Sequence, residues 1–241
     1  MATTSPGPRP RSPSGQAVSV LDHPAGPPRE VALVVGGDGP VSRIICRRLA
    51  AEGITAAIAG PSAHQVGQYG KALADERIRA LPYLVDLAEW DSIDQLVTDV
   101  VTELGRLDVL VNLAATAASS DTASEWSRVL KVNLAGGYRL GRAAARAMAD
   151  AGRPGRIVVL TPSPRADGEG DPAAGVSAAG IASFVADWAR LMPWRRITVN
   201  AVVPESTADP DSVASAILLL LRTDRAVTGQ SVTVPGPGVR R

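Results

Sequence analysis

The sequence predicts an α/β protein with a single doubly wound parallel sheet of about seven strands and helices on both faces. The first observation is the stretch 31–53, where an uninterrupted apolar run (31–35) leads into a glycine-rich turn and then a helical pattern. Continuous apolar runs are typical of parallel strands buried on both faces. The second observation is that apolar runs and amphipathic helical patterns continue to alternate as far as residue 234, which favours parallel strands joined by crossover helices.

The composition limits the kinds of protein this can be. A chain of 241 residues suits one domain with a large core, and a formal net charge of +1 does not suggest a nucleic-acid surface. No apolar run approaches the ~20 residues of a membrane span, so we expect no membrane partner. The single cysteine, Cys46, is expected to be a buried hydrophobe, and the absence of any disulfide fits a cytoplasmic protein. The abundance of arginine and alanine is typical of a GC-rich bacterial genome.

The N-terminal segment differs from the rest. Residues 1–29 are rich in proline, serine, threonine and glycine and lack the apolar region of a signal peptide. Because proline resists both helix and sheet, we expect a flexible or polyproline-like tail. The alternative is a docking arm for a partner. The folded domain is expected to span residues 30–241.

The remaining elements follow from periodicity. Asp91 is expected to cap the helix that it precedes, and Leu191 is expected on the buried stripe of its helix. The helix at 211–222 is apolar nearly all round, so it should be covered on more than one side. The pattern predicts a strand ending at Asn112, further strands at 54–59, 78–86, 156–161, 196–203 and 230–234, and helices at 63–74, 91–104, 123–151, 172–192 and 211–222.

Short motifs recur between these elements in a recognisable order. With the glycine turn, they resemble the short-chain dehydrogenase/reductase family from Glu30 to Gly236. The resemblance implies a Rossmann-type fold, an NAD(P) cofactor and oxidoreductase chemistry. The motifs are Leu84–Leu87, Gly105–Asn112, Val132–Gly136, Gly155–Val158, Ile197–Ala201 and Thr228–Gln230.

The resemblance also implies which residues would hold the cofactor, and they are Gly36, Gly37, Gly39, Asp86, Leu87 and Asn112. The phosphate loop departs from the family pattern, because Pro40 and Ser42 replace two of its glycines. Pro40 removes an amide that would face a phosphate. The strand end at Gly60 offers neither an acid for ribose nor an arginine for a 2′-phosphate. We therefore expect no cofactor or weakly bound NAD(P), and no metal.

The catalytic positions of the family depart further. Its Tyr-x-x-x-Lys motif, which supplies the proton donor, aligns with Val176 and Gly180, and its serine aligns with Pro162. Asn133 matches the family asparagine that kinks a helix and holds a proton-relay water. Ser163 and Ser177 are the remaining hydroxyl candidates. The segment that closes over substrate in the family is nearly absent after Glu205.

Three hypotheses follow. The first is a non-catalytic structural or regulatory subunit that forms homo- or hetero-oligomers, with an active short-chain oxidoreductase as the expected partner. It would use helices 123–151 and 172–192, or helix 211–222 with strand 230–234. The second is an atypical NAD(P)-dependent reductase or a non-redox cyclase or lyase. The third is a dinucleotide or small-molecule sensor. The groups available to the second hypothesis are Asp167, Glu169, Asp171, Ser163 and Ser177.

Overall fold

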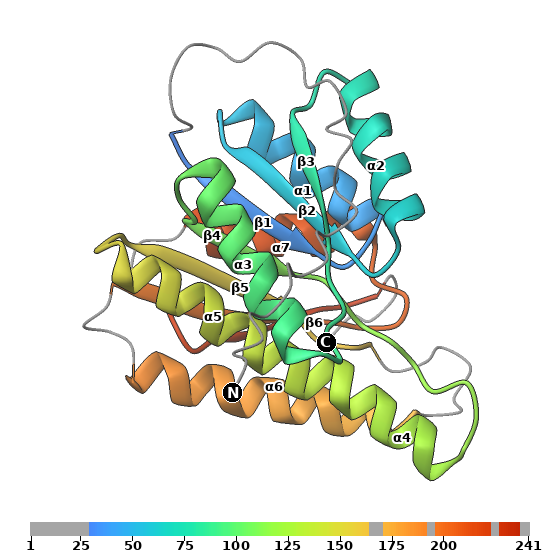
Figure 1. The fold of residues 1–241 in the computed structure, drawn as a ribbon. Coiled ribbons are helices and arrows are strands. Elements are labelled where there is room, and N and C mark those ends of the chain that lie inside the picture. The colour runs from blue at the N-terminus through green and yellow to red at the C-terminus, as the bar shows by residue number, and fades with distance from the viewer. Residues whose placement is uncertain (1–28, 164–170, 192–195, 223–226, 237–241) are drawn as a thin grey trace, which may run out of the picture.

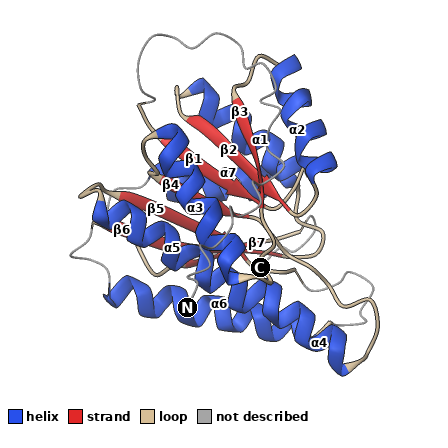
Figure 2. Cartoon of the chain, in the orientation of Figure 1, coloured by secondary structure: helices blue, strands red, loops and turns tan. Residues whose placement is uncertain are grey.

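A computed structural model describes residues 29–163, 171–191, 196–222 and 227–236. Its strands form one parallel sheet of seven strands, as predicted, and their order is β3-β2-β1-β4-β5-β6-β7 (Figures 1 and 2). Strands β2 and β3 are added toward one side of β1, and β4 and the later strands are added toward the other side. The carboxyl ends of β1 and β4 therefore flank the switch point, where doubly wound sheets bind ligands. The strands are β1 (Val31–Val35), β2 (Thr55–Gly60), β3 (Ala80–Leu84), β4 (Val109–Asn112), β5 (Gly155–Leu160), β6 (Ile197–Pro204) and β7 (Ser231–Val234).

Helices cover both faces of this sheet, and each face has its own apolar core. One core lies under α1 (Pro40–Ala51), α2 (Ala63–Asp75) and α7 (Pro210–Arg222). The other lies under α3 (Trp90–Leu104), α5 (Gly137–Asp150) and α6 (Pro172–Leu191). The central strands β1 and β2 are buried along their whole length, which explains why their sequence shows no alternation.

The helix predicted at 123–151 is interrupted near Asn133, the residue that matches the family's helix-kinking asparagine. It consists of α4 (Ala123–Leu130), a π-helical turn η1 (Lys131–Gly136) and α5. The cause lies partly at Asn133, whose side chain bonds the main chain of a neighbouring loop, and partly at Gly136, which approaches Leu87 so closely that a Cβ would lie 2.3 Å from the Leu87 carbonyl oxygen.

Three smaller expectations also need correction. Glu89, not Asp91, occupies the N-cap position of α3, and Asp91 lies in the first turn. Leu191 is 66% exposed at the end of α6 instead of continuing its buried stripe. Strand β3 is shorter than predicted because residues 78–79 and 85–86 form its connections.

Helix α7 is covered as its composition predicts. Its apolar residues pack against the sheet and α1 within the same chain, and Leu219 is the exposed exception at 61%. Cys46 is buried, as expected. Among the described residues, no helix has both the length and the apolar character needed to cross a membrane. Of the predicted tail, residues 1–28 lie outside the described residues.

Candidate functional site

The glycine turn after β1 is fixed by a close contact with β4. Gly36 has φ +118°, and a Cβ there would lie 2.3 Å from the Ala114 amide nitrogen, so only glycine fits. Its own amide donates to the Ala59 carbonyl at the end of β2. At Gly37 and Gly39 an added Cβ would meet nothing within 4 Å. This side of the turn is therefore open, as a surface that receives a ligand must be.

The groups beneath the turn are polar and closely packed. Ser42 is buried, and its hydroxyl lies 3.0 Å from the Tyr69 hydroxyl. Burial raises the pKa of the Cys46 thiol, which lies beside both groups, and burial likewise raises the pKa of Tyr69. The hydroxyl at position 42 is thus accommodated by a partner from α2. Helix α1 nevertheless begins at Pro40, so its first turn has two amides, at Val41 and Ser42, without a partner among the described residues.

Only a small hollow remains between the turn and the end of β2. Its volume is about 20 Å³, and its lining includes Gly37, Asp38, Gly60, Pro61 and Tyr69. Enclosed sites for small molecules usually measure ~300 Å³ or more. The lining contains a carboxylate and no cationic side chain, so its charge does not favour a phosphate.

The other predicted cofactor residues lie at the same edge, but their polar groups bind the main chain. Asp86 accepts a hydrogen bond from the Ala88 amide (2.8 Å), and Asn112 accepts one from the Ala114 amide (3.1 Å). Leu87 is only 6% exposed and belongs to the core. The register pairs Asn112 with Val35, so the structure brings Asn112 beside the glycine turn.

Asn133 has both ends of its amide occupied. Its Oδ1 accepts from the Thr116 amide and its Nδ2 donates to the Thr116 carbonyl, each at 2.8 Å. The side chain is 2% exposed. Asn133 therefore ties the loop after β4 to the π-helical turn, and these two bonds are a structural role.

The first turns of α6 carry no proton donor at the aligned positions. Val176 is 45% exposed, and a Cβ at Gly180 would lie 2.7 Å from a methyl group of Leu134. Ser177 is fully buried and donates to the Ala173 carbonyl at 2.7 Å. In this structure the Ser177 hydroxyl therefore bonds its own helix. Pro162 follows β5, and Ser163 beside it is partly buried.

Of the three acidic candidates, Asp171 caps a helix, and the other two lie outside the described residues. Asp171 caps α6, because its Oδ1 accepts from the amides of Ala173 and Ala174. Its Oδ2 accepts from the Ala118 amide at 2.8 Å, which ties α6 to the loop after β4. Asp167 and Glu169 lie outside the described residues.

The connection from β6 to α7 is as short as the sequence predicts. Residues 205–209 alone separate the two elements, and Glu205 accepts a hydrogen bond from the Gly236 amide at 2.9 Å. Such a link leaves little chain to cover a substrate.

Two features of the structure have no signal in the sequence. The Thr161 hydroxyl, at the carboxyl end of β5, is buried and has no hydrogen-bond partner among the described residues. A cavity of about 350 Å³ lies at the opposite edge of the sheet. Both depend on packing between distant segments. Across the described ranges, no group of histidine, cysteine, aspartate or glutamate is arranged to hold a metal ion.

Comparisons with known proteins agree with this fold. Residues 30–216 match the family described as short chain dehydrogenase. The cis-4-hydroxycyclohexanecarboxylate dehydrogenase of Sinomonas cyclohexanicum is 32% identical over 180 residues, which is 72% of each chain. The 3-oxoacyl-(acyl-carrier-protein) reductase of Escherichia coli K12 is 30% identical over 181 residues, covering 73% of this chain and 72% of the relative.

Solved structures give the same result. A metagenomic short-chain oxidoreductase in complex with NADP superposes with a TM-score of 0.74 at 27% identity, covering 86% of this chain and 96% of that one. An actinorhodin polyketide ketoreductase with NADPH has a TM-score of 0.77 at 24% identity over the same shares, and shows the fold alone. The extent of the family match and the identity to curated relatives lead to one conclusion. The chain belongs to the short-chain dehydrogenase family.

Proposed function

We propose that this chain is a non-catalytic member of its family that serves as a structural or regulatory subunit of an active short-chain oxidoreductase. The observation that carries the proposal is the start of α6, where Val176 and Gly180 stand four residues apart at the positions of the family's tyrosine and lysine. Reduction of a carbonyl needs a proton donor beside the substrate oxygen. The chain has no tyrosine after Tyr138 and no lysine after Lys131, so a shifted register does not restore the pair.

The cofactor half of the site supports the same proposal. The relatives with solved structures carry NADP or NADPH, and the open turn at Gly37 and Gly39 retains part of such a site. Pro40 removes one amide, Asp38 adds a negative charge, and the hollow beside Gly60 holds about 20 Å³. The residues present therefore fit the adenosine end of a dinucleotide only in part. We infer no cofactor or a weakly bound one.

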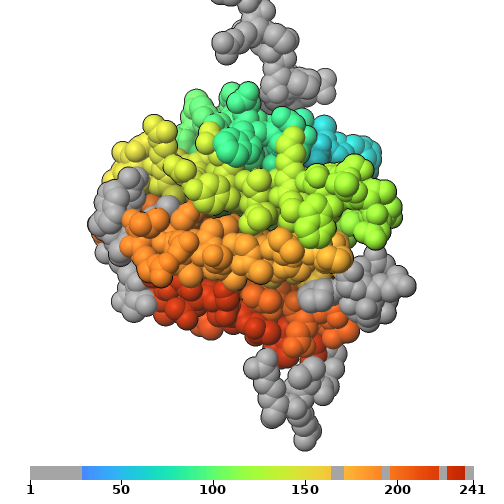
Figure 3. Space-filling model, turned by 90° about the horizontal axis from the view of Figure 1, so that it is seen from below, coloured from blue at the N-terminus to red at the C-terminus, as the bar shows by residue number. Residues whose placement is uncertain are grey.

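The partner surface in this proposal is the outward face of α4, η1, α5 and α6. Figure 3 shows α6 running along this face beside the α4–α5 segment. The exposed residues of α6 include the small residues Gly175, Ala179 and Ala186, and small side chains allow a second helix to approach closely. Larger apolar groups flank them, with Trp126 39% and Val176 45% exposed. Helix α7 supports an interface less, since its own chain covers most of its apolar surface.

The test is native mass spectrometry of the purified chain, with and without NADPH, together with a matched pair of variants. We expect an oligomer without bound cofactor and no hydride transfer. Ala179→Glu places a charge on the exposed face of α6 and should shift the mass to the monomer. Ala74→Glu, at an exposed position of α2, should leave the oligomer intact.

The opposite results are equally clear. A monomer at all concentrations, alone and mixed with active short-chain reductases, would exclude the subunit role. Stoichiometric NADPH would instead favour the sensor or a rebuilt enzyme, and oxidation of that NADPH by a carbonyl substrate would decide for the enzyme.

A further inference from the structure

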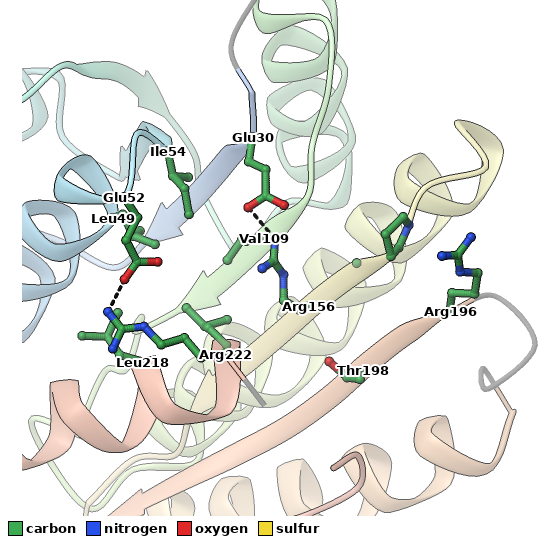
Figure 4. Close-up of a pocket in the computed structure, with 13 residues that line it drawn as sticks. Glu30, Leu49, Glu52, Ile54, Val109, Arg156, Arg196, Thr198, Leu218 and Arg222 are labelled. Atoms are coloured by element: carbon green, nitrogen blue, oxygen red, sulfur yellow. Dashed lines mark hydrogen bonds and ion pairs between the residues drawn. The ribbon is translucent and has the colours of Figure 1, made fainter. Parts of the chain in front are cut away.

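The cavity of about 350 Å³ lies at the amino ends of the strands, at the opposite edge from the glycine turn (Figure 4). Strands β4, β5 and β6 form its floor, and the carboxyl ends of α1 and α7 form one wall. This volume falls within the range of small-molecule sites. The apolar part of the lining is Leu49, Ile54, Val109, Leu218 and Leu221.

A polar pair interrupts the apolar floor. The sheet register aligns Val109 of β4 with Arg156 of β5, and Arg156 with Thr198 of β6. Residues aligned across neighbouring strands point to the same face, with Cβ atoms about 5 Å apart. A guanidinium and a hydroxyl therefore stand side by side on the floor, although the rest of this face packs as an apolar core.

The hydroxyl of this pair has no partner. Thr198 is 6% exposed, and its side chain makes no hydrogen bond to any residue that the structure describes. Figure 4 shows its oxygen directed toward the cavity. Because this hydroxyl faces the cavity and makes no bond within the described residues, it is available to a ligand that replaces the water there.

The charged side chains around the cavity leave one positive charge. Glu30 pairs with Arg156 (2.8 Å), and Glu52 pairs with Arg222. Arg196 at the rim has no ion pair with any described residue, and its φ is +59°, which is a strained backbone for a residue other than glycine. A ligand with a single negative charge would complete the balance.

The helix ends decide how such a ligand would lie. The carboxyl ends of α1 and α7 carry partial negative charge, so the region beside Glu52 and Leu221 repels an anion. The other end of the cavity is lined by Arg156 of β5, Thr198 of β6 and Arg196, which directly precedes β6 (Figure 4). The anionic group belongs at that end and an apolar body at the leucine end.

We propose that this cavity binds a small amphipathic carboxylate, with its carboxylate on Arg156 and Thr198, Arg196 at the rim, and its alkyl chain against Leu218 and Leu221. The site does not depend on the proposed subunit role, since it lies at the opposite edge of the sheet from the aligned catalytic positions.

The experiment is calorimetric titration of the full chain with hexanoate, and nuclear magnetic resonance mapping of the shifts. We expect hexanoate to bind and acetate to bind at least tenfold more weakly, because acetate leaves the apolar wall unfilled. Hexylammonium should not bind, because its charge is opposite. The shifts should cluster on residues that line the cavity.

Variants assign the contacts. Thr198→Val keeps the shape of the side chain and should weaken hexanoate about five- to tenfold, the value of one hydrogen bond. Arg156→Gln should weaken it at least tenfold through loss of a charged donor. Arg146→Gln, on an exposed face of α5, is the matched control and should leave binding unchanged. Thermal melting confirms that each variant is folded.

Three results would overturn the proposal. One is no binding of hexanoate up to about 10 mM, a concentration at the weak limit of specific recognition. Another is binding of hexylammonium as tight as that of hexanoate. The third is hexanoate affinity that neither Thr198→Val nor Arg156→Gln changes.

Discussion

The carboxyl ends and the amino ends of the strands use their polar side chains in different ways. At the carboxyl ends of the strands, Asn112, Asn133, Asp86 and Asp171 all bind main-chain groups of nearby loops or helix starts. At the amino ends, arginines pair with glutamates and the Thr198 hydroxyl faces a cavity. The first arrangement stabilises loops, whereas the second leaves the Thr198 hydroxyl facing the cavity.

The side chains at the carboxyl ends of the strands show that a residue matched to a family site can also hold a loop in place. At Asn112 and Asn133, two positions that the family resemblance assigns to cofactor or catalysis, the side-chain amide oxygen accepts a hydrogen bond from the main chain. A residue that matches the family motif at one position is therefore not by itself evidence for the family's reaction.

The largest expected effect is at Asn133. Asn133→Leu removes two hydrogen bonds and leaves the amide and carbonyl of Thr116 without partners. We expect the free energy of unfolding to fall by about 2–3 kcal/mol, measured by urea denaturation. Asn133→Asp keeps one acceptor and should lose less. A loss below about 0.5 kcal/mol for Asn133→Leu would show that the carboxyl-end loops are held by other contacts.

A smaller effect, of opposite sign, is expected at Thr161. Thr161 lies at the carboxyl end of β5, where the other polar side chains discussed bind main-chain groups. Its own hydroxyl is buried without a partner among the described residues. Thr161→Val should stabilise the protein by about 1 kcal/mol. Thr198→Val is the comparison at the other edge and should change stability by less than about 0.5 kcal/mol, because the cavity admits water to its hydroxyl. A destabilised Thr161→Val would mean that this hydroxyl has a partner in solution.

The smallest effect concerns acid stability. Glu125 bonds Arg128 and the amide and hydroxyl of Ser119 in the loop before α4, and these partners lower its pKa from 4.5 to about 2. A depressed pKa in the folded state stabilises above the unfolded value, and this contribution is lost as the pH falls. The stability difference between wild type and Glu125→Gln should be constant above pH 4.5 and shrink toward pH 2. A difference that does not change with pH would contradict the assigned pKa.

The fold could be predicted from sequence because its signals are local. An apolar run such as 31–35 predicts a strand, and an apolar stripe such as that of α3 predicts a helix. The family motifs indicate the order of these elements along the chain. The family motif implied a kink at Asn133, but the π-helical form of residues 131–136 was not predicted, because its sequence has the same periodicity as the helices on either side. It depends on contacts with Thr116 and Leu87, which are distant in sequence.

The site was predictable only in part. Gly36 and Asn112 lie together at the switch point, as their motifs imply. The burial of Ser177 and the capping role of Asp171 depend on bonds that become visible only in three dimensions. The cavity at the amino ends could not be foreseen, because Arg156 and Thr198 become neighbours only through the register of β5 and β6.

The π-helical turn also determines how the chain tolerates changes of length. A π-turn holds one residue more than an α-helical turn would. Removal of a single residue between Lys131 and Gly136 would let the segment close as regular helix. Each residue of an α-helix turns the chain by about 100°, so the deletion would rotate α4 about its axis relative to α5 and move Trp126 off its present face. A deletion here acts as a rotation of one helix rather than as a shortening.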